Sequence, residues 1–283
     1  MATKKSNVNV GDAGVVAVVQ PGGPQLPAAT SDALLIEDLA ADVGGGLGNV
    51  RADDLALPFL TILQGQSPQV LNGVEGARVG AMFNTVTSRS YKSVRLVPCA
   101  FIKAWVEWRD RDKGGGLVKQ HDTDELMATT TRNDKNIDVL PNGNHLIPTA
   151  YHYCLMLDED GVPHRVVLGM KSTALKKSRR WLSTIADLKL PIGPGGGYAT
   201  PPSWAHVYEV TTVLERNKQG KEYFNWSIGD PKPLTSRDLY LAGRGFNQEV
   251  LAGGVTVTPP EELSEPEVEA RANSFDADEK VPF

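Results

Sequence analysis

The run of residues 94–109 constrains the fold of this chain more than any other segment. It is rich in β-branched and aromatic residues, which predicts one long β-strand. A strand of this length is expected to bend, either to serve two sheets or to close a barrel. The sequence therefore predicts a curved β structure built around this strand.

The segments after the long strand are predicted to form two hairpins with a helix between them. In chain order they are strands at 151–157 and 164–168 around a turn at 158–161, a helix at 172–188, and strands at 204–214 and 222–228 around a turn at 217–220. A long strand, a hairpin, a helix and a hairpin is the element order of the OB-fold, a five-stranded Greek-key barrel.

We therefore expect a mainly β fold, a β-barrel with helices. Its body is predicted to be an OB-fold-like five-stranded barrel with an extra strand at 79–86, a long loop insertion at 110–148 and a C-terminal helix at 236–251. Ser236 suits the N-cap of that last helix, because its hydroxyl can accept a hydrogen bond from a free backbone amide.

Composition divides the chain into three predicted parts. Residues 1–52 are a flexible N-terminal arm with one short helix at 31–41, residues 53–255 are the OB-like domain, and residues 256–283 are a disordered acidic tail. No segment approaches the roughly 20 apolar residues that a membrane span needs. Cys99 and Cys154 lie in apolar, strand-like runs, which predicts buried free thiols. A cytoplasmic protein with no membrane partner is expected.

The net charge of −5 conceals an asymmetry. Residues 259–283 hold eight acids and two bases, and residues 1–52 hold five acids and three bases, so residues 53–258 carry +3. A mildly basic body with an acidic tail is the asymmetry expected when a tail competes with an anionic ligand. The overall acidity is therefore no argument against a nucleic-acid partner.

The long strand combines aromatic and cationic side chains on one face. At a period of two, Ile102, Ala104, Val106 and Trp108 face the core, and the opposite side carries Phe101, Lys103, Trp105 and Arg109. Aromatic faces that stack bases, next to cations that bind phosphates, are what single-strand binding requires. Trp105 is the strongest stacking candidate. The alternative is an aromatic strand packed beneath the 110–148 insertion.

Two further cationic segments are candidates for a phosphate track. The turn before the long strand holds Arg89, Tyr91, Lys92 and Arg95, and the helix at 172–188 and its approach hold Lys171, Lys176, Lys177, Arg179 and Arg180. On the helix, Leu175, Trp181 and Ile185 share the opposite, apolar face. Both segments also fit ordinary solvated surfaces, and the helix of an OB-fold usually lies away from its binding groove.

The chain ends in an acidic patch followed by Val281, Pro282 and a terminal Phe283. A C-terminal Phe joins an apolar ring to a free carboxylate, which suits a hydrophobic pocket rimmed by Lys or Arg. This ending resembles the C-terminus of bacterial and phage single-stranded-DNA-binding proteins. The matching residues are Phe275, Asp276, Asp278, Glu279, Val281, Pro282 and Phe283, whereas Ala277 and Lys280 depart from the pattern. An ordinary acidic tail is the alternative.

The resemblance implies a single-stranded-DNA-binding protein of bacteriophage type that is not an enzyme. Such a protein would coat and protect single-stranded DNA during replication, recombination and repair, in the host cytoplasm if the chain is encoded by a phage. The tail would recruit replication and recombination proteins and compete with DNA for the basic groove. Proteins of this kind often form homo-oligomers. No catalytic residue, metal ion or cofactor is implied.

Three other functions remain open at this point. A strand-annealing recombination protein would share most of these features. A metal-dependent nuclease would need the acids at 121–125, or a convergence of His152, Cys154 and His164. A phage structural or protein-interaction module would use the barrel without binding nucleic acid.

Overall fold

The computed structural model describes residues 42, 45–50, 54–110, 113–134, 136–191, 196–217, 220–255, 257 and 259. Contacts divide the chain between Val43 and Gly44, and the fold described below lies in the second unit, residues 44–283. The predicted helix at 31–41 and the predicted tail motif at 275–283 lie outside the described residues. The predicted arm, domain and tail boundaries therefore stay predictions.

The largest sheet of the described residues has eight antiparallel strands. Six of them lie side by side in the order β13 (Glu222–Pro233), β12 (His206–Arg216), β4 (Ser93–Trp108), β8 (His145–Leu157), β7 (Asp138–Val139) and β6 (Thr131–Arg132). The other two, β5 (Leu117–His121) and β9 (Pro163–Lys171), pair with β4 and β8 respectively.

Smaller elements surround this sheet in the described part of the chain. They are a sheet of β1 (Leu60–Ile62), β2 (Met82–Asn84) and β3 (Ser90–Tyr91), a hairpin of β10 (Leu190–Pro191) and β11 (Tyr198–Ala199), the helices α2 (Pro68–Leu71), α3 (Ala174–Asp187) and α4 (Arg237–Leu251), and the 3-10 turns η3 (Glu125–Thr129) and η4 (Ser203–Ala205). None of the described helices is long and apolar enough to cross a membrane.

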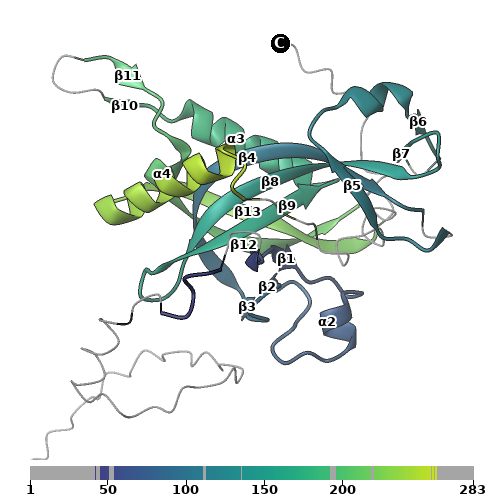
Figure 1. The fold of residues 1–283 in the computed structure, drawn as a ribbon, viewed down its shortest axis with the longest axis horizontal. Coiled ribbons are helices and arrows are strands. Elements are labelled where there is room, and N and C mark those ends of the chain that lie inside the picture. The colour runs from purple at the N-terminus through teal and green to yellow at the C-terminus, as the bar shows by residue number, and fades with distance from the viewer. Residues whose placement is uncertain are drawn as a thin grey trace, which may run out of the picture. The chain divides into compact units, whose positions relative to one another are not determined.

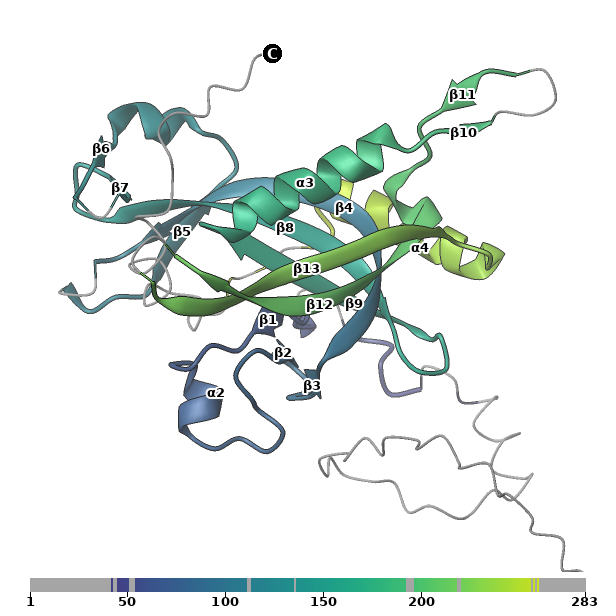
Figure 2. The same ribbon diagram turned by 180° about the vertical axis from the view of Figure 1, so that it is seen from behind.

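The five strands predicted to form the barrel lie in the order β9, β8, β4, β12 and β13, and together they curl into a half-barrel (Figure 1). The prediction of a mainly β fold with helices is confirmed. Among the described residues, the two outer strands β9 and β13 do not pair with each other. Helix α3 follows β9 and precedes β12 in the chain, and it contacts both β9 and β13, so it covers the open seam (Figure 2).

Strand β4 bends at a β-bulge between Pro98 and Ala100, where the pairing with β8 shifts by one residue. Proline has no backbone N–H to donate, which is why it occurs in sheets mainly at edges and bulges. The extra residue reverses the alternation of side chains. Leu96 lies on the face of the sheet that α3 covers, but beyond the bulge that face is occupied by the odd-numbered residues, beginning with Phe101.

The two long helices pack on opposite faces of the large sheet (Figures 1 and 2). On one face, Trp181 and Ile185 of α3 join a cluster with Leu96, Cys154 and Tyr208. On the other face, Phe246 and Val250 of α4 pack with alternate residues of β4 and β8. The side chains of β8 alternate between these two cores, so both faces of the strand are buried. Ser236 caps α4 as expected, by accepting a hydrogen bond from the Leu239 amide.

The predicted loop insertion at 110–148 contains more regular structure than its sequence indicates. It includes β5, η3, β6 and β7, and strand β8 begins at His145, inside the predicted loop. The buried carboxylate of Glu107 holds this insertion against β4, because it accepts hydrogen bonds from Asn142 Nδ2 at 3.0 Å and Asn144 Nδ2 at 2.6 Å. His121 Nε2 lies 2.9 Å from its other oxygen.

Other predicted elements are correct in kind and shifted at their ends. The predicted strand at 79–86 shortens to β2, and the strand predicted from residue 204 begins at His206, because Trp204 lies in η4. The helix predicted from residue 172 begins at Ala174, since Ser172 has a positive φ of 50° that an α-helix cannot contain. Both cysteines are buried and free, as expected.

Candidate nucleic-acid interface

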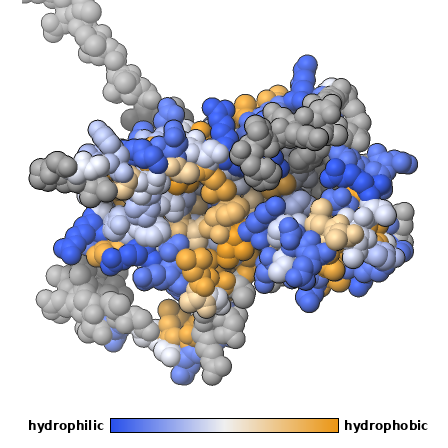
Figure 3. Space-filling model, turned by 90° about the horizontal axis from the view of Figure 1, so that it is seen from above, coloured by the Kyte–Doolittle hydropathy of each residue, from blue (hydrophilic) through white to orange (hydrophobic). Residues whose placement is uncertain are grey.

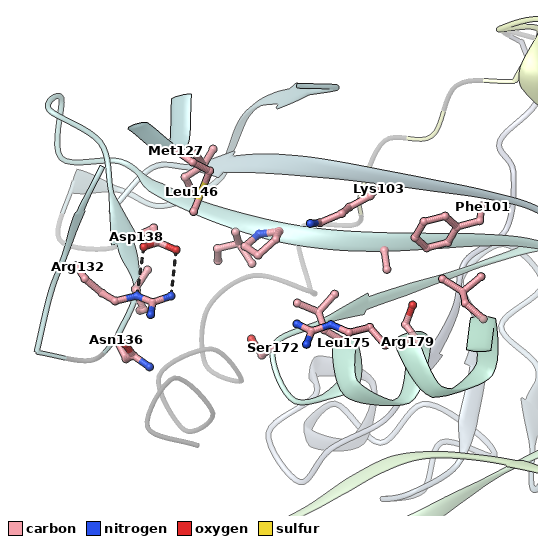
Figure 4. A pocket seen from close by; sticks show the side chains of 16 residues that line it. Phe101, Lys103, Met127, Arg132, Asn136, Asp138, Leu146, Ser172, Leu175 and Arg179 are labelled. Carbon is pink, nitrogen blue, oxygen red and sulfur yellow. Dashed lines mark hydrogen bonds and ion pairs between the residues drawn. The ribbon is translucent and has the colours of Figure 1, made fainter. Parts of the chain in front are cut away.

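A cavity among the described residues has a volume of about 470 Å³. It lies between β4 and β8, the β6–β7 hairpin, η3 and α3. Phe101 lies at one end of the cavity and Arg132, Asn136 and Asp138 at the other (Figure 4). On the face that is uppermost in Figure 1, apolar residues gather in a central band between two more hydrophilic parts (Figure 3). A concave, largely apolar site with a few convergent polar groups is the usual form of a ligand site.

The bulge in β4 places an aromatic ring in this cavity. Phe101 pairs with His152 of β8, and their ring centroids are 5.2 Å apart. Phe101 nevertheless remains 37% exposed. An exposed aromatic face inside a cavity is a surface on which a planar ligand can stack.

Three cations reach the cavity from three different elements. Lys103 comes from β4, Arg132 from β6 and Arg179 from α3. Lys103 Nζ is held 4.7 Å from the centroid of the Trp105 ring, a cation–π contact. Arg132 Nε lies 3.3 Å from Asp138 Oδ1, so one of the three charges is compensated. The cavity therefore presents a net excess of positive charge to a ligand.

One wall of the cavity carries a buried polar pair. Ser178 of α3 lines the cavity, and its Oγ lies 2.8 Å from His152 Nε2. The ring of His152 stacks on Trp181 with a centroid distance of 4.8 Å. Complete burial lowers the pKa of His152 to about 3, because the charged form would lose its hydration. His152 is therefore neutral at physiological pH and fixes the position of the Ser178 hydroxyl.

The structure brings three of the predicted DNA-binding residues together, namely Phe101, Lys103 and Arg179. Trp105, the strongest stacking candidate in the sequence, is half-buried and is not part of the cavity wall. Its ring contacts Lys103, which does line the cavity, so Trp105 supports a cavity residue. Arg179 projects from the same helix as Lys176 and Arg180, which are exposed outside the cavity.

Two of the predicted cations outside the cavity contact distant side chains of the protein. Lys171 is buried, and its Nζ lies 5.8 Å from the centroid of the Trp108 ring. Lys177 Nζ lies 2.6 Å from Glu215 Oε1 on β12. Both contacts are tertiary, so the helical pattern that selected these residues could not reveal them.

The remaining predicted residues lie apart from the cavity. Arg89, Tyr91 and Lys92 belong to the β2–β3 hairpin and the residue that follows it, and Arg95 donates to the carbonyl of Asp158 at the β8–β9 turn. Arg95 is eight residues from Lys103, or about 26 Å along an extended strand. Arg109 follows the end of β4, beyond a second irregularity at Glu107 and Trp108. The tail residues lie outside the described residues.

The described residues contain no group of three or more His, Cys, Asp or Glu side chains that could hold a metal ion. His152 is buried against Trp181, whereas His164 Nε2 pairs with Asp158 at 3.1 Å on the exposed β8–β9 turn. His121 pairs with Glu107. The three histidines considered for a nuclease are therefore divided among separate contacts.

The sequence interpretation missed Arg132, Asn136, Asp138 and Ser178. The first three lie in the insertion, which has no periodicity to assign their direction. Ser178 carried a weak signal, because it lies one helical turn from Leu175 and Leu182 on the apolar face of α3. A single hydroxyl on that face is consistent with packing as well as with a ligand contact.

A family model described as Pam3 phage gp34-like protein matches residues 29–256. The chain belongs to this family. The part matched by the Pam3 phage gp34-like model includes all the cavity residues and ends before the tail motif at 275–283. The expected bacteriophage origin agrees with this membership. No curated protein and no solved structure matches the chain.

Proposed function

We propose that this member of the Pam3 phage gp34-like family binds and protects single-stranded DNA during phage DNA replication or recombination. The observation that carries the proposal is the exposed ring of Phe101 inside a cavity that Lys103, Arg132 and Arg179 also line. Base–aromatic stacking contributes about 1–3 kcal/mol per base, and cations next to the ring can hold the phosphates on either side.

The bound DNA strand would follow the α3 side of the sheet. Helix α4 packs over the other face of β4 and β8, where Phe246 and Tyr153 rings lie 6.3 Å apart, so that face is occupied. On the α3 side, the exposed cations Lys176 and Arg180 continue the positive surface beyond the cavity. This path differs from that of an OB-fold, whose strands two and three usually present the binding face.

The role of the tail in this proposal rests on its sequence. The acidic segment that ends in Val281, Pro282 and Phe283 would recruit partner enzymes and would occupy the cationic surface when DNA is absent. Removing residues 275–283 would then leave DNA affinity equal or higher and abolish capture of the partners. Weaker DNA binding by the truncated chain would contradict this role.

The test of the proposal is a titration of the full chain with oligo-dT at low and at high salt, in which tryptophan fluorescence reports binding. Quenching that weakens with salt is expected, because each phosphate contact releases counterions and contributes roughly −0.7 to the logarithmic salt slope. The proposal fails if, at low salt, neither quenching nor a mobility shift occurs with the full chain or with a chain that lacks residues 259–283. Degradation of the oligonucleotide with Mg²⁺ or Mn²⁺ would instead indicate a nuclease.

A further inference from the structure

The cavity resembles a site for a discrete molecule more than a track for a polymer. Its volume of about 470 Å³ lies within the range of about 300–1,000 Å³ that is typical of small-ligand sites. It is bounded at one end by Phe101 and at the other by the β6–β7 hairpin (Figure 4). We infer that the cavity takes one nucleotide as a unit, base and phosphate together, so that a free mononucleotide also binds there. This inference rests on the proposed function.

The base would occupy the apolar part of the cavity. It would stack on the exposed ring of Phe101, next to apolar side chains from both walls, including Pro148 of β8 and Leu175 of α3. The Ser178 hydroxyl is nearly fully buried and is fixed by His152, so it offers a polar contact within this apolar surface. A base that enters the cavity must leave the stack of bases in the DNA strand. The contact with the Phe101 ring compensates for part of the lost stacking energy.

The phosphate would lie between Lys103 and Arg179. These residues extend from opposite walls, one from β4 and the other from α3 (Figure 4). Neither forms an ion pair with an acidic side chain among the residues that the structure describes. Arg132, by contrast, already pairs with Asp138 at the far end of the cavity, where the carboxylate disfavours an anion. The charges therefore place the phosphate between Lys103 and Arg179 and not beside the β6–β7 hairpin.

The test uses the full chain with a fluorescent oligo-dT as the reporter and three competitors, which are dTMP, thymidine and inorganic phosphate. We expect dTMP to displace the oligonucleotide and thymidine to be at least roughly tenfold weaker, since hydrogen bonds to a charged group contribute about 1.5–3 kcal/mol. Arg179→Met should weaken dTMP binding by roughly tenfold on the same basis. Arg244→Met is the control, because Arg244 is an exposed cation of α4, on the opposite face of the sheet, and does not line the cavity.

The outcomes separate this inference from the proposed function. If the oligonucleotide binds and millimolar dTMP does not displace it, the inference is overturned and the proposed function stands. If thymidine competes as well as dTMP, or if Arg244→Met weakens dTMP binding as much as Arg179→Met, the assigned phosphate position is overturned. If dTMP binds directly and the oligonucleotide does not, the nucleotide cavity is supported and single-strand binding is rejected. If neither ligand binds, both are rejected.

Discussion

Lys177 Nζ lies 2.6 Å from Glu215 Oε1, and this contact joins α3 to strand β12 beside the open seam of the half-barrel. The second oxygen of Glu215 accepts hydrogen bonds from Asn225 Nδ2 at 2.8 Å and from the Tyr223 hydroxyl at 3.1 Å. The carboxylate therefore connects the helix to both strands of the β12–β13 hairpin. Its pKa is lowered: burial alone would raise it, and the hydrogen bonds and charge of its partners outweigh that effect.

Glu215→Ala should lower the free energy of unfolding by about 1–3 kcal/mol, because the buried amide of Asn225 and the ammonium of Lys177 lose their acceptor together. Urea unfolding followed by circular dichroism measures this change. Glu222→Ala is the control: it also removes an acid from the hairpin, but its partner Arg216 is well exposed, so a change within about 0.5 kcal/mol is expected. Equal losses in the two variants would show that the Glu215 contacts contribute no more than a surface pair.

His152 should make the stability of the protein depend on pH in the mildly acidic range. Its pKa falls from an ordinary 6.5 to about 3 on folding, so between these values the unfolded chain binds a proton that the folded chain does not. The contribution of neutral His152 to the free energy of unfolding is therefore complete above about pH 6.5 and decreases as the pH falls toward 3. The melting temperature should decrease more steeply from pH 7.5 to pH 5 in the wild type than in His152→Gln. This range includes the ordinary pKa of histidine. Parallel curves would refute this role.

Two glycines of α4 should respond to alanine in opposite ways. A Cβ at Gly243 would lie 2.9 Å from Trp204 Cβ and 3.3 Å from its Cγ, whereas a Cβ at Gly245 would meet nothing within 4 Å. Gly245→Ala should therefore stabilise the protein by about 0.5–1 kcal/mol, the ordinary advantage of alanine within a helix. Gly243→Ala should destabilise it, since η4 must move away from the helix. A stabilised Gly243→Ala variant in thermal unfolding would show that this contact is not close.

Phe101→Ala should weaken oligo-dT binding by about 1–3 kcal/mol, the value of one stacked base. Tyr198→Ala is the matched control, because Tyr198 is a highly exposed aromatic residue on the β10–β11 hairpin, outside the cavity. Trp105→Ala should have a smaller effect than Phe101→Ala, since Trp105 does not line the cavity and contacts Lys103, which does. Fluorescence anisotropy of a labelled oligonucleotide measures all three affinities. If Trp105→Ala has the largest effect, the base stacks on Trp105 and the cavity is not the binding site.

The long elements could be predicted from the sequence because their signals are local. Strand β4, both hairpins, α3 and α4 follow from residue periodicity, turn residues and the Ser236 cap. Strands β1, β6 and β7 could not be predicted, because two or three residues carry no period. They depend on distant partners, as when Phe59, next to β1, bridges to Val167 of β9.

The candidate site could be predicted only where it lies on regular elements. Phe101 and Lys103 follow from the alternation of a strand, and Arg179 follows from the polar face of a helix. The same rules also selected Lys171 and Lys177, because neither burial nor an ion pair with a distant strand is visible in a local pattern. Arg132 and Asp138 lie in the irregular insertion, whose path depends on side-chain contacts such as those of Glu107.

The bulge at Pro98 means that the count of residues in β4 matters as much as their identity. Phe101 and Lys103 face α3 because one extra residue precedes them, as the pairing with β8 shows. Deleting that residue would exchange the α3-facing and the α4-facing side chains along the rest of the strand. Ala104 and Val106 would then line the cavity, and an aromatic ring and a cation would be forced beneath α4. A chain with every binding side chain intact would thus lose its binding surface through a change in parity alone.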